Sequence, residues 1–174
     1  FQTEMWRRNR KLLEALYLAG EADHAYGLMA ATHDRSWWNM VAGGSTMAWE
    51  AWDLKYKKNQ DWNHAWGAAP GNIIPRWLVG VRPLEPGFGK ILIHPQPGPL
   101  EKAALRLPTI RGAVEVSFEN PKGAPFTLSF TTPGNTTATV RLEDALGKTG
   151  AVSVDGRAVE GRRQGRAVEI VNLA

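Results

Sequence analysis

The chain has 174 residues, of which 43% are hydrophobic, and it carries 21 Lys and Arg against 17 Asp and Glu. This length and hydrophobic content suffice for one ordinary domain or two small ones, which excludes a disordered or fibrous chain. The net charge of +4 is spread along the chain rather than concentrated, so we expect no nucleic-acid partner. The absence of cysteine excludes disulfides and thiolate chemistry. No apolar run approaches the roughly 20 residues that span a bilayer, so we expect no membrane segment.

The chain begins with a helical pattern. Residues 1–4 contain no initiator methionine and do not begin a signal peptide. Residues 5–13 have a helical pattern without a capping residue before it. We therefore expect a fragment of a longer protein. Apolar residues at helical spacing between Leu12 and Tyr17 extend this helix, and Gly20 ends it. A second helix is predicted over residues 22–32.

The third predicted helix leads to an isolated glutamate. It begins after Ser36, whose hydroxyl can cap the first turn. It should stop at Gly43 and Gly44, because glycine loses the most backbone entropy on becoming helical. Glu50 is therefore expected in a connection and not within a helix.

A further helical stretch is predicted from Asn63, a good capping residue. Pro70-Gly71 and Pro75 should interrupt it, and Pro75 fits as the first residue of a resumed helix. Short helices joined by short connections favour an antiparallel helical array.

The composition changes near residue 80. All eight Trp lie between Trp6 and Trp77. Residues 81–90 contain two prolines and two glycines, so this stretch reads as the crossing between domains. We therefore predict two domains, residues 1–82 and 83–174.

Short alternating or β-branched runs dominate the second domain. They cover residues 91–93, 103–107, 112–118, 126–130, 137–142, 152–154 and 167–171. Asp155-Gly156 is a strong hairpin signal, because both positions tolerate positive φ. The predicted fold class is α + β, with helices first and an antiparallel β-sandwich second.

Several chemistries are excluded by the pattern of reactive residues. His24, His33, His64 and His94 lack a paired metal-ligand spacing, so we expect no metal. The chain has no Gly-x-Ser-x-Gly elbow and no phosphate-binding loop, and we expect no cofactor. Carboxylate chemistry remains.

The window from Gly44 to Ala68 is rich in Trp and contains a single Glu, Glu50. Glycoside hydrolysis needs two carboxyl groups, and indole faces stack on sugar C–H surfaces, so Trp49-Glu50 and Trp52 fit half of such a site. From spacing alone, a Trp-rich core with a surface or capping Glu is the more frequent outcome. Asp53 can likewise bind a hydroxyl or begin a turn, and a lone His64 is usually a packing residue.

The stretch Gly44-Ser45-Thr46-Met47-Ala48-Trp49-Glu50-Ala51-Trp52-Asp53 resembles the Gly-Ala-Thr-Thr-x-Trp-Glu-x-Trp-Asp pattern of a known family, the bacterial α-L-rhamnosidases of glycoside hydrolase family 78. Asn63-His64-Ala65-Trp66-Gly67-Ala68 is similar to its Asn-His-x-x-x-Gly-Ala element, one residue shorter. The stretch from Gly80 to Pro97 resembles the exit from the family's barrel, and the stretch from Pro133 to Val140 resembles a strand of its terminal sandwich.

The resemblance implies an (α/α)₆ six-hairpin barrel whose last helices are residues 1–82, followed by a C-terminal β-sandwich. It implies an inverting α-L-rhamnosidase in which Glu50 is the general base. His64, Trp49, Trp52, Asp53 and Trp66 would form the binding pocket for a rhamnose-containing glycoside or polysaccharide.

The resemblance also implies that the general acid lies upstream, outside this chain. The missing part of the barrel is then a partner of this segment, and we expect the segment alone to be inactive. Two alternatives stay open: a six-hairpin-barrel glycosidase for another sugar, and a non-catalytic carbohydrate-binding or structural module. The compartment, bacterial cytoplasm or exterior, is not decided by the sequence.

Overall fold

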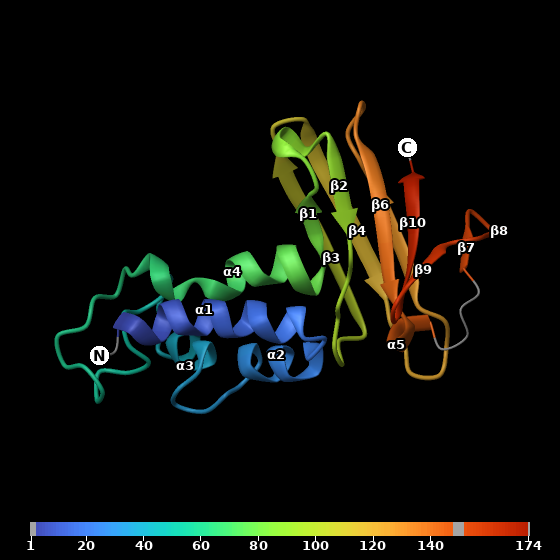
Figure 1. Cartoon of the computed structure of the whole chain (residues 1–174). Helices are drawn as coiled ribbons and strands as arrows, with labels where there is room; N and C mark the ends of the chain where they lie inside the picture. The colour runs from blue at the N-terminus through green and yellow to red at the C-terminus, as the bar shows by residue number, and fades with distance from the viewer. Residues whose placement is uncertain (1–2, 148–151, 174) are drawn as a thin grey trace. The chain divides into compact units, whose positions relative to one another are not determined.

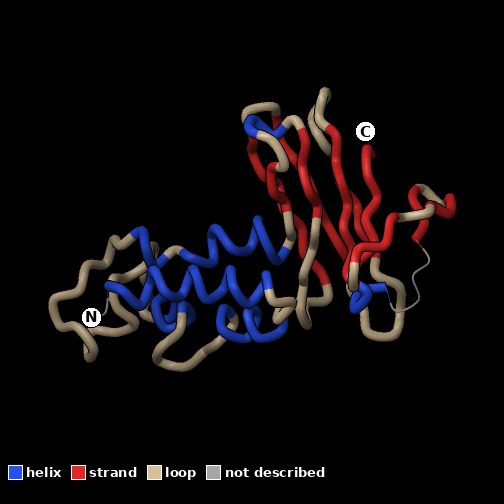
Figure 2. Tube along the Cα trace, in the orientation of Figure 1, coloured by secondary structure: helices blue, strands red, loops and turns tan. Residues whose placement is uncertain are grey.

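The computed structural model of the chain describes residues 3–147 and 152–173. The chain divides into two compact units, Phe1–Ile74 and Pro75–Ala174. Helices form the first unit and strands dominate the second (Figures 1 and 2). The α + β character predicted from the sequence is confirmed.

The helices follow the predicted order. They are α1 (Thr3–Leu18), α2 (Ala22–Met29), α3 (Trp37–Ala42), the 3₁₀ helix η1 (Ala65–Gly67), α4 (Ala69–Ile73) and the π-helical turn η2 (Ile74–Leu78), which crosses the division between the units. α1 buries Leu13 and Tyr17 on one face, and Gly20 follows it with a φ of +81°. A residue with a Cβ would be strained in that conformation, which explains why glycine terminates this helix. In the described part of the chain, no helix has the length and apolar character needed to cross a membrane.

The ends of α3 agree with the sequence prediction. The Ser36 hydroxyl oxygen accepts a hydrogen bond from the Asn39 N–H at 3.3 Å, so Ser36 is the N-cap. Gly43 is the C-cap, and Gly44 has a φ of +78°. Glu50 lies in the connection that follows, as predicted.

The helix predicted from Asn63 is wrong in two respects. His64 is extended, with φ −125° and ψ 98°, and only the short η1 follows it. Pro70 does not interrupt a helix but lies in the first turn of α4. The first turn tolerates proline because its N–H groups have no intrahelical partner there.

The described residues of the second unit form three sheets. The five-stranded sheet has the order β1 (Val81–Pro83), β2 (Lys90–Ile93), β6 (Thr137–Glu143), β10 (Ala167–Leu173) and β9 (Arg162–Gln164). The three-stranded sheet is β3 (Lys102–Thr109), β4 (Gly112–Glu119) and β5 (Thr127–Thr131), and the two-stranded sheet is β7 (Val152–Val154) and β8 (Arg157–Val159). Two short helical turns, η3 (Pro86–Phe88) and α5 (Asp144–Gly147), lie in the connections.

Among the described strands the pairing is antiparallel, as predicted, except for one parallel pair that the sequence did not indicate. β2 and β6 are parallel, with Ile91 opposite Ala138 and Ile93 opposite Val140. A parallel pair requires a long crossover between its strands. Here β3, β4 and β5 form that crossover and pair with one another in a separate sheet.

Alternation of apolar and polar residues explains the core of the β unit. On β4, Val114, Val116 and Phe118 are buried while the residues between them are exposed. Ile91 and Ile93 of β2 are buried in the same alternating way. The predicted hairpin at Asp155-Gly156 is confirmed, because both residues have positive φ and join β7 to β8.

Candidate active site around Glu50

Residues 48–64 form a loop, here called the Glu50 loop, which backbone hydrogen bonds fold back on itself. The Glu50 N–H donates to the Asp61 carbonyl at 2.8 Å, and the His64 N–H donates to the Ala48 carbonyl at 2.8 Å. The Ala51 N–H donates to the Gln60 side-chain oxygen at 3.0 Å. These bonds bring the two halves of the Trp-rich window together, so that the segment from Asp61 to His64 lies against the segment that carries Glu50.

Glu50 is a buried carboxylate with cationic and N–H donors around it. Only 7% of its side chain is exposed. Its Oε1 forms an ion pair with the Lys57 ammonium, and its Oε2 accepts a hydrogen bond from the Asp61 N–H at 3.2 Å. The Lys57 hydrogen bond, then the Asp61 N–H, hold the pKa of Glu50 below its usual value, and the nearby His64 acts in the same direction. Glu50 is therefore ionised at neutral pH and can accept a proton.

His64 lies in the segment from Asp61 to His64, which runs back past Glu50. Its side chain is 19% exposed, and its Nδ1 lies 3.9 Å from an Asp61 carboxylate oxygen. The structure thus brings together two residues that the sequence singled out, Glu50 and His64, through the bonds at Ala48 and Asp61. A half-buried imidazole at this position can donate or accept one hydrogen bond to a bound molecule.

Trp49 and Trp52 lie in the core beneath Glu50. They are 5% and 8% exposed and form a cluster with Met40 of α3. Trp37 meets Trp52 edge to face, with ring centroids 5.1 Å apart, and its indole N–H donates to the Gly67 carbonyl at 2.6 Å. These contacts fix the backbone on both sides of Glu50, so the two indoles support the site from within.

The exposed indole of the Glu50 loop is Trp62, which the sequence analysis did not select. Its side chain is 49% exposed, and its ring lies 4.9 Å from that of Trp49 at an angle of 37°. Its position directly before Asn63-His64 was the available signal. The side chain of Trp66, which the sequence did select, lies outside what the structure describes.

Asp53 begins a turn, one of the two roles left open by the sequence. Its Oδ1 accepts from the Lys55 N–H at 3.0 Å, and its Oδ2 accepts from the Asn39 side-chain amide at 3.1 Å. Its carbonyl accepts from the N–H groups of Tyr56 and Lys57. The Lys55 N–H, then the Asn39 amide, lower the pKa of Asp53. This turn places Lys57 next to Glu50. The turn itself agrees with the turn-forming preference of Asp.

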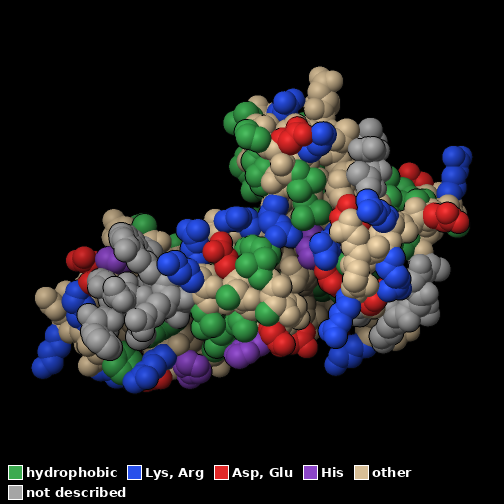
Figure 3. Space-filling model, viewed as in Figure 1, with side chains coloured by type: hydrophobic (Ala, Val, Ile, Leu, Met, Phe, Trp, Pro, Cys, Tyr) green, Lys and Arg blue, Asp and Glu red, His purple; other side chains and the backbone are tan. Residues whose placement is uncertain are grey.

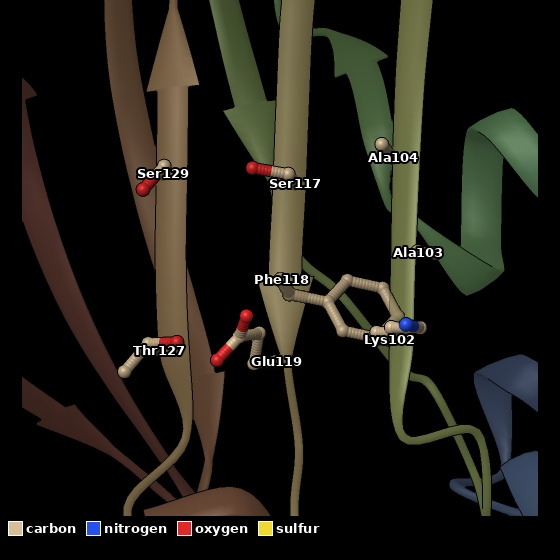
Figure 4. A pocket seen from close by; sticks show the side chains of 8 residues that line it. All are labelled: Lys102, Ala103, Ala104, Ser117, Phe118, Glu119, Thr127 and Ser129. Atoms are coloured by element: carbon tan, nitrogen blue, oxygen red, sulfur yellow. The ribbon is translucent and has the colours of Figure 1, made fainter.

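The described residues offer no group of three or more His, Asp and Glu side chains that could hold a metal ion. A shallow hollow of about 590 Å³ lies on the exposed face of the β3–β4–β5 sheet (Figure 4). Ala104, Ser117 and Ser129 form a row across it, in register between the strands. Phe118, the aromatic residue of this hollow, is only 2% exposed, so the hollow presents no ring on which a sugar can stack.

The Glu50 loop thus holds the candidate catalytic and sugar-binding side chains. It carries a buried, ionised carboxylate, a half-buried imidazole and an exposed indole on a helical unit that precedes a β unit. Carboxylates perform the proton transfers of glycoside hydrolysis, and indoles bind sugar rings. These features are typical of a segment of a glycoside hydrolase.

Comparison with known proteins specifies the family. The model of the bacterial alpha-L-rhamnosidase 6 hairpin glycosidase domain matches residues 8–78, and that of the bacterial alpha-L-rhamnosidase C-terminal domain matches residues 80–157. An alpha-L-rhamnosidase of Formosa agariphila is 33% identical over 141 residues, which are 75% of this chain and 15% of the relative.

Two solved structures agree in fold. That of alpha-L-rhamnosidase from Dictyoglumus thermophilum has a TM-score of 0.84 at 25% identity, over 95% of this chain and 19% of that chain. The Streptomyces avermitilis alpha-L-rhamnosidase complexed with L-rhamnose has a TM-score of 0.75 at 24% identity, over 94% of this chain and 16% of that chain. The chain belongs to the bacterial α-L-rhamnosidase family. It spans 13–15% of the length of the relatives that it matches.

Proposed function

We propose that this chain is the segment of an α-L-rhamnosidase that supplies the general base, Glu50, for inverting hydrolysis of terminal α-L-rhamnosyl groups. The observation that carries the proposal is a buried carboxylate whose ionised form is stabilised by Lys57 and the Asp61 N–H. A general base must be unprotonated when its substrate binds, and Glu50 meets that requirement at neutral pH.

The reaction follows from this assignment. Glu50 removes a proton from a water molecule, whose oxygen then attacks the anomeric carbon from the face opposite the departing group. The bond between that carbon and the glycosidic oxygen breaks, and the oxygen takes a proton from an acid that this chain does not supply. The two carboxyl groups of an inverting enzyme stand roughly 6.5–9.5 Å apart, which leaves room for the water.

The remaining site residues take supporting roles in this proposal. His64 forms a hydrogen bond to a hydroxyl of the sugar, and Trp66 contributes to the pocket wall. Trp49 and Trp52 hold the floor of the pocket in place from the core, and Asp53 does so through its turn. The substrate is a rhamnose-containing glycoside or polysaccharide, in line with the activity named for the relatives.

We further propose that the helices close a six-hairpin barrel and that the sheets form its C-terminal sandwich. Exposed hydrophobic side chains on the helical unit support this arrangement. Leu12 and Leu18 of α1 and Trp38 and Val41 of α3 are each more than 45% exposed, and Figure 3 shows hydrophobic side chains at the surface of this unit. Apolar surface of this kind is typical of a face that another part of a protein covers.

The test is a hydrolysis experiment with the complete gene product that carries these residues. We expect turnover of an aryl α-L-rhamnoside in preference to aryl glycosides of other sugars. Proton NMR at early times should show the β anomer of L-rhamnose as the first product. Release of the α anomer first would contradict inversion, and preference for another aryl glycoside would contradict the substrate. The 174-residue chain alone should show no turnover, since it lacks the acid.

A further inference from the structure

Lys57 is the closest cationic partner that the Glu50 loop provides for Glu50. Its Nζ forms an ion pair with Oε1, while the Asp61 N–H occupies Oε2 at 3.2 Å. The two donors come from different parts of the loop and bind different oxygens. A carboxylate held at both oxygens has a defined orientation, because rotation about its last bond would break one of the two contacts.

The loop holds Lys57 in place on both sides. Before it, the Asp53 carbonyl accepts from the Lys57 N–H at 3.3 Å, and Asn39 of α3 anchors the Asp53 carboxylate at 3.1 Å. After it, the Lys57 carbonyl accepts from the Gln60 N–H at 3.2 Å, and the Gln60 side chain in turn binds the Ala51 N–H. Hydrogen bonds of the loop therefore fix the backbone positions of Lys57 and of the residue after Glu50, in addition to the ion pair between the two side chains.

A second lysine of the same turn shows what an ordinary surface pair looks like. Lys55 pairs with Asp34, but these side chains are 53% and 47% exposed. Lys57 and Glu50 are 32% and 7% exposed. Solvent and salt screen the first pair more than the second. The Lys55 hydrogen bond nevertheless lowers the pKa of Asp34 to about 2, so the two pairs differ in burial and not in the presence of an effect on the carboxylate.

We propose that Lys57 is a positioning residue of the hydrolytic site, which orients the Glu50 carboxylate and keeps it ionised for its role as base. This inference rests on the proposed function of Glu50. Lys57 does not touch the substrate; it acts through Glu50. The lowered pKa of Glu50, caused first by the Lys57 hydrogen bond, agrees with this role.

The consequence concerns the pH dependence of turnover. Without Lys57, the pKa of Glu50 rises, so the base becomes protonated at a higher pH and activity is lost earlier as the pH falls. The His64 side chain and the Asp61 N–H also act on Glu50, and the Asp61 carboxylate lies 3.9 Å from His64. These groups are unchanged in a Lys57 variant. A shift of the acidic limb between wild type and variant therefore reports the contribution of Lys57.

The experiment measures kcat and kcat/KM against pH for an aryl α-L-rhamnoside, using the complete gene product. Lys57→Met and Lys57→Gln should move the acidic limb of kcat/KM upward by about one pH unit, the lower end of the effect of one opposite charge. They should also lower kcat more than they raise KM. Lys57→Arg should restore the position of the limb, and Lys55→Met should leave the profile unchanged.

Two results distinguish a failure of the Lys57 proposal from a failure of the proposed general-base function of Glu50. If Glu50→Gln abolishes turnover while both neutral Lys57 variants keep the wild-type acidic limb, Glu50 remains the base and the role of Lys57 is overturned. If Glu50→Gln leaves turnover intact, the proposed function fails, and the role of Lys57 fails with it.

Discussion

Gly80 should be intolerant of any side chain, because the backbone approaches it too closely. Its φ is +87°, and a Cβ built on it would lie 1.9 Å from the His94 carbonyl oxygen and 2.7 Å from the Pro95 nitrogen. Two hydrogen bonds hold the strands at this separation: the His94 N–H donates to the Gly80 carbonyl, and the Gln96 N–H donates to the Leu78 carbonyl, each at 3.0 Å. Gly80→Ala must therefore move one backbone away from the other.

The destabilisation can be worked from these contacts. The left-handed conformation costs about 1–2 kcal/mol for a residue with a Cβ. The His94 carbonyl must retreat by about 1 Å to reach an acceptable contact, which disrupts two flanking hydrogen bonds worth about 0.5–1.5 kcal/mol each. We therefore expect Gly80→Ala to lower the free energy of unfolding by about 2–5 kcal/mol.

Urea unfolding of the chain, followed by far-ultraviolet circular dichroism, measures this loss. Gly123→Ala is a matched control, since Gly123 has a similar φ of +81° and a Cβ there would meet no atom within 4 Å. The control should lose only the conformational part, about 1–2 kcal/mol. Equal stability of the two variants would refute the argument from backbone contact.

Two further predictions concern buried groups. Trp49→Ala should lower the free energy of unfolding by about 3–5 kcal/mol, because it leaves a cavity in the core beneath Glu50. Trp62→Ala should lower it by less than about 1 kcal/mol. Similar losses for the two variants in urea unfolding would contradict the assignment of Trp49 to the core. Burial lowers the pKa of His94 below its usual value of about 6.5. The positive charges of Arg82 and Arg141 lower this pKa further, whereas Glu143, at 2.7 Å, raises it. Protonation then favours the unfolded state, so stability should be highest above pH 6.5 and fall as the pH drops towards the lower folded-state pKa. His94→Gln should flatten that part of the stability curve, and an unchanged slope would contradict this role of His94.

The sequence predicted those parts of the fold that local chemistry determines. Ser36 caps α3, Gly43 and Gly44 end it, and Asp155-Gly156 forms its hairpin, because each depends on the conformational preferences of one or two residues. The parallel pairing of β2 with β6 depends on a crossover through another sheet, which no local pattern encodes. The strands β1, β8 and β9 have three residues each, and they lack the Val-Ser-Val alternation by which the equally short β7 was predicted.

In the candidate site, too, the sequence predicted the residues with local motifs and missed the contacts that depend on how the loop folds. Glu50 and His64 were selected from motifs, and the loop brings them together. The motifs did not distinguish the buried Trp49 from the exposed Trp62, because an irregular loop has no periodicity from which to read burial. The ion pair between Lys57 and Glu50 arises from the turn that Asp53 begins, and it becomes visible only when that turn is placed against the rest of the loop.

The central claim is that Glu50 is the general base, and the kcat of Glu50→Gln in the complete gene product tests it most directly. Glutamine keeps the shape of the side chain and removes its basicity. With an aryl α-L-rhamnoside as substrate, kcat should fall by about 10²-fold or more while KM changes little, because the base acts in the transition state. Asp34→Asn, which alters an exposed carboxylate of the same unit, should leave kcat unchanged. A kcat for Glu50→Gln within about tenfold of wild type would contradict the claim.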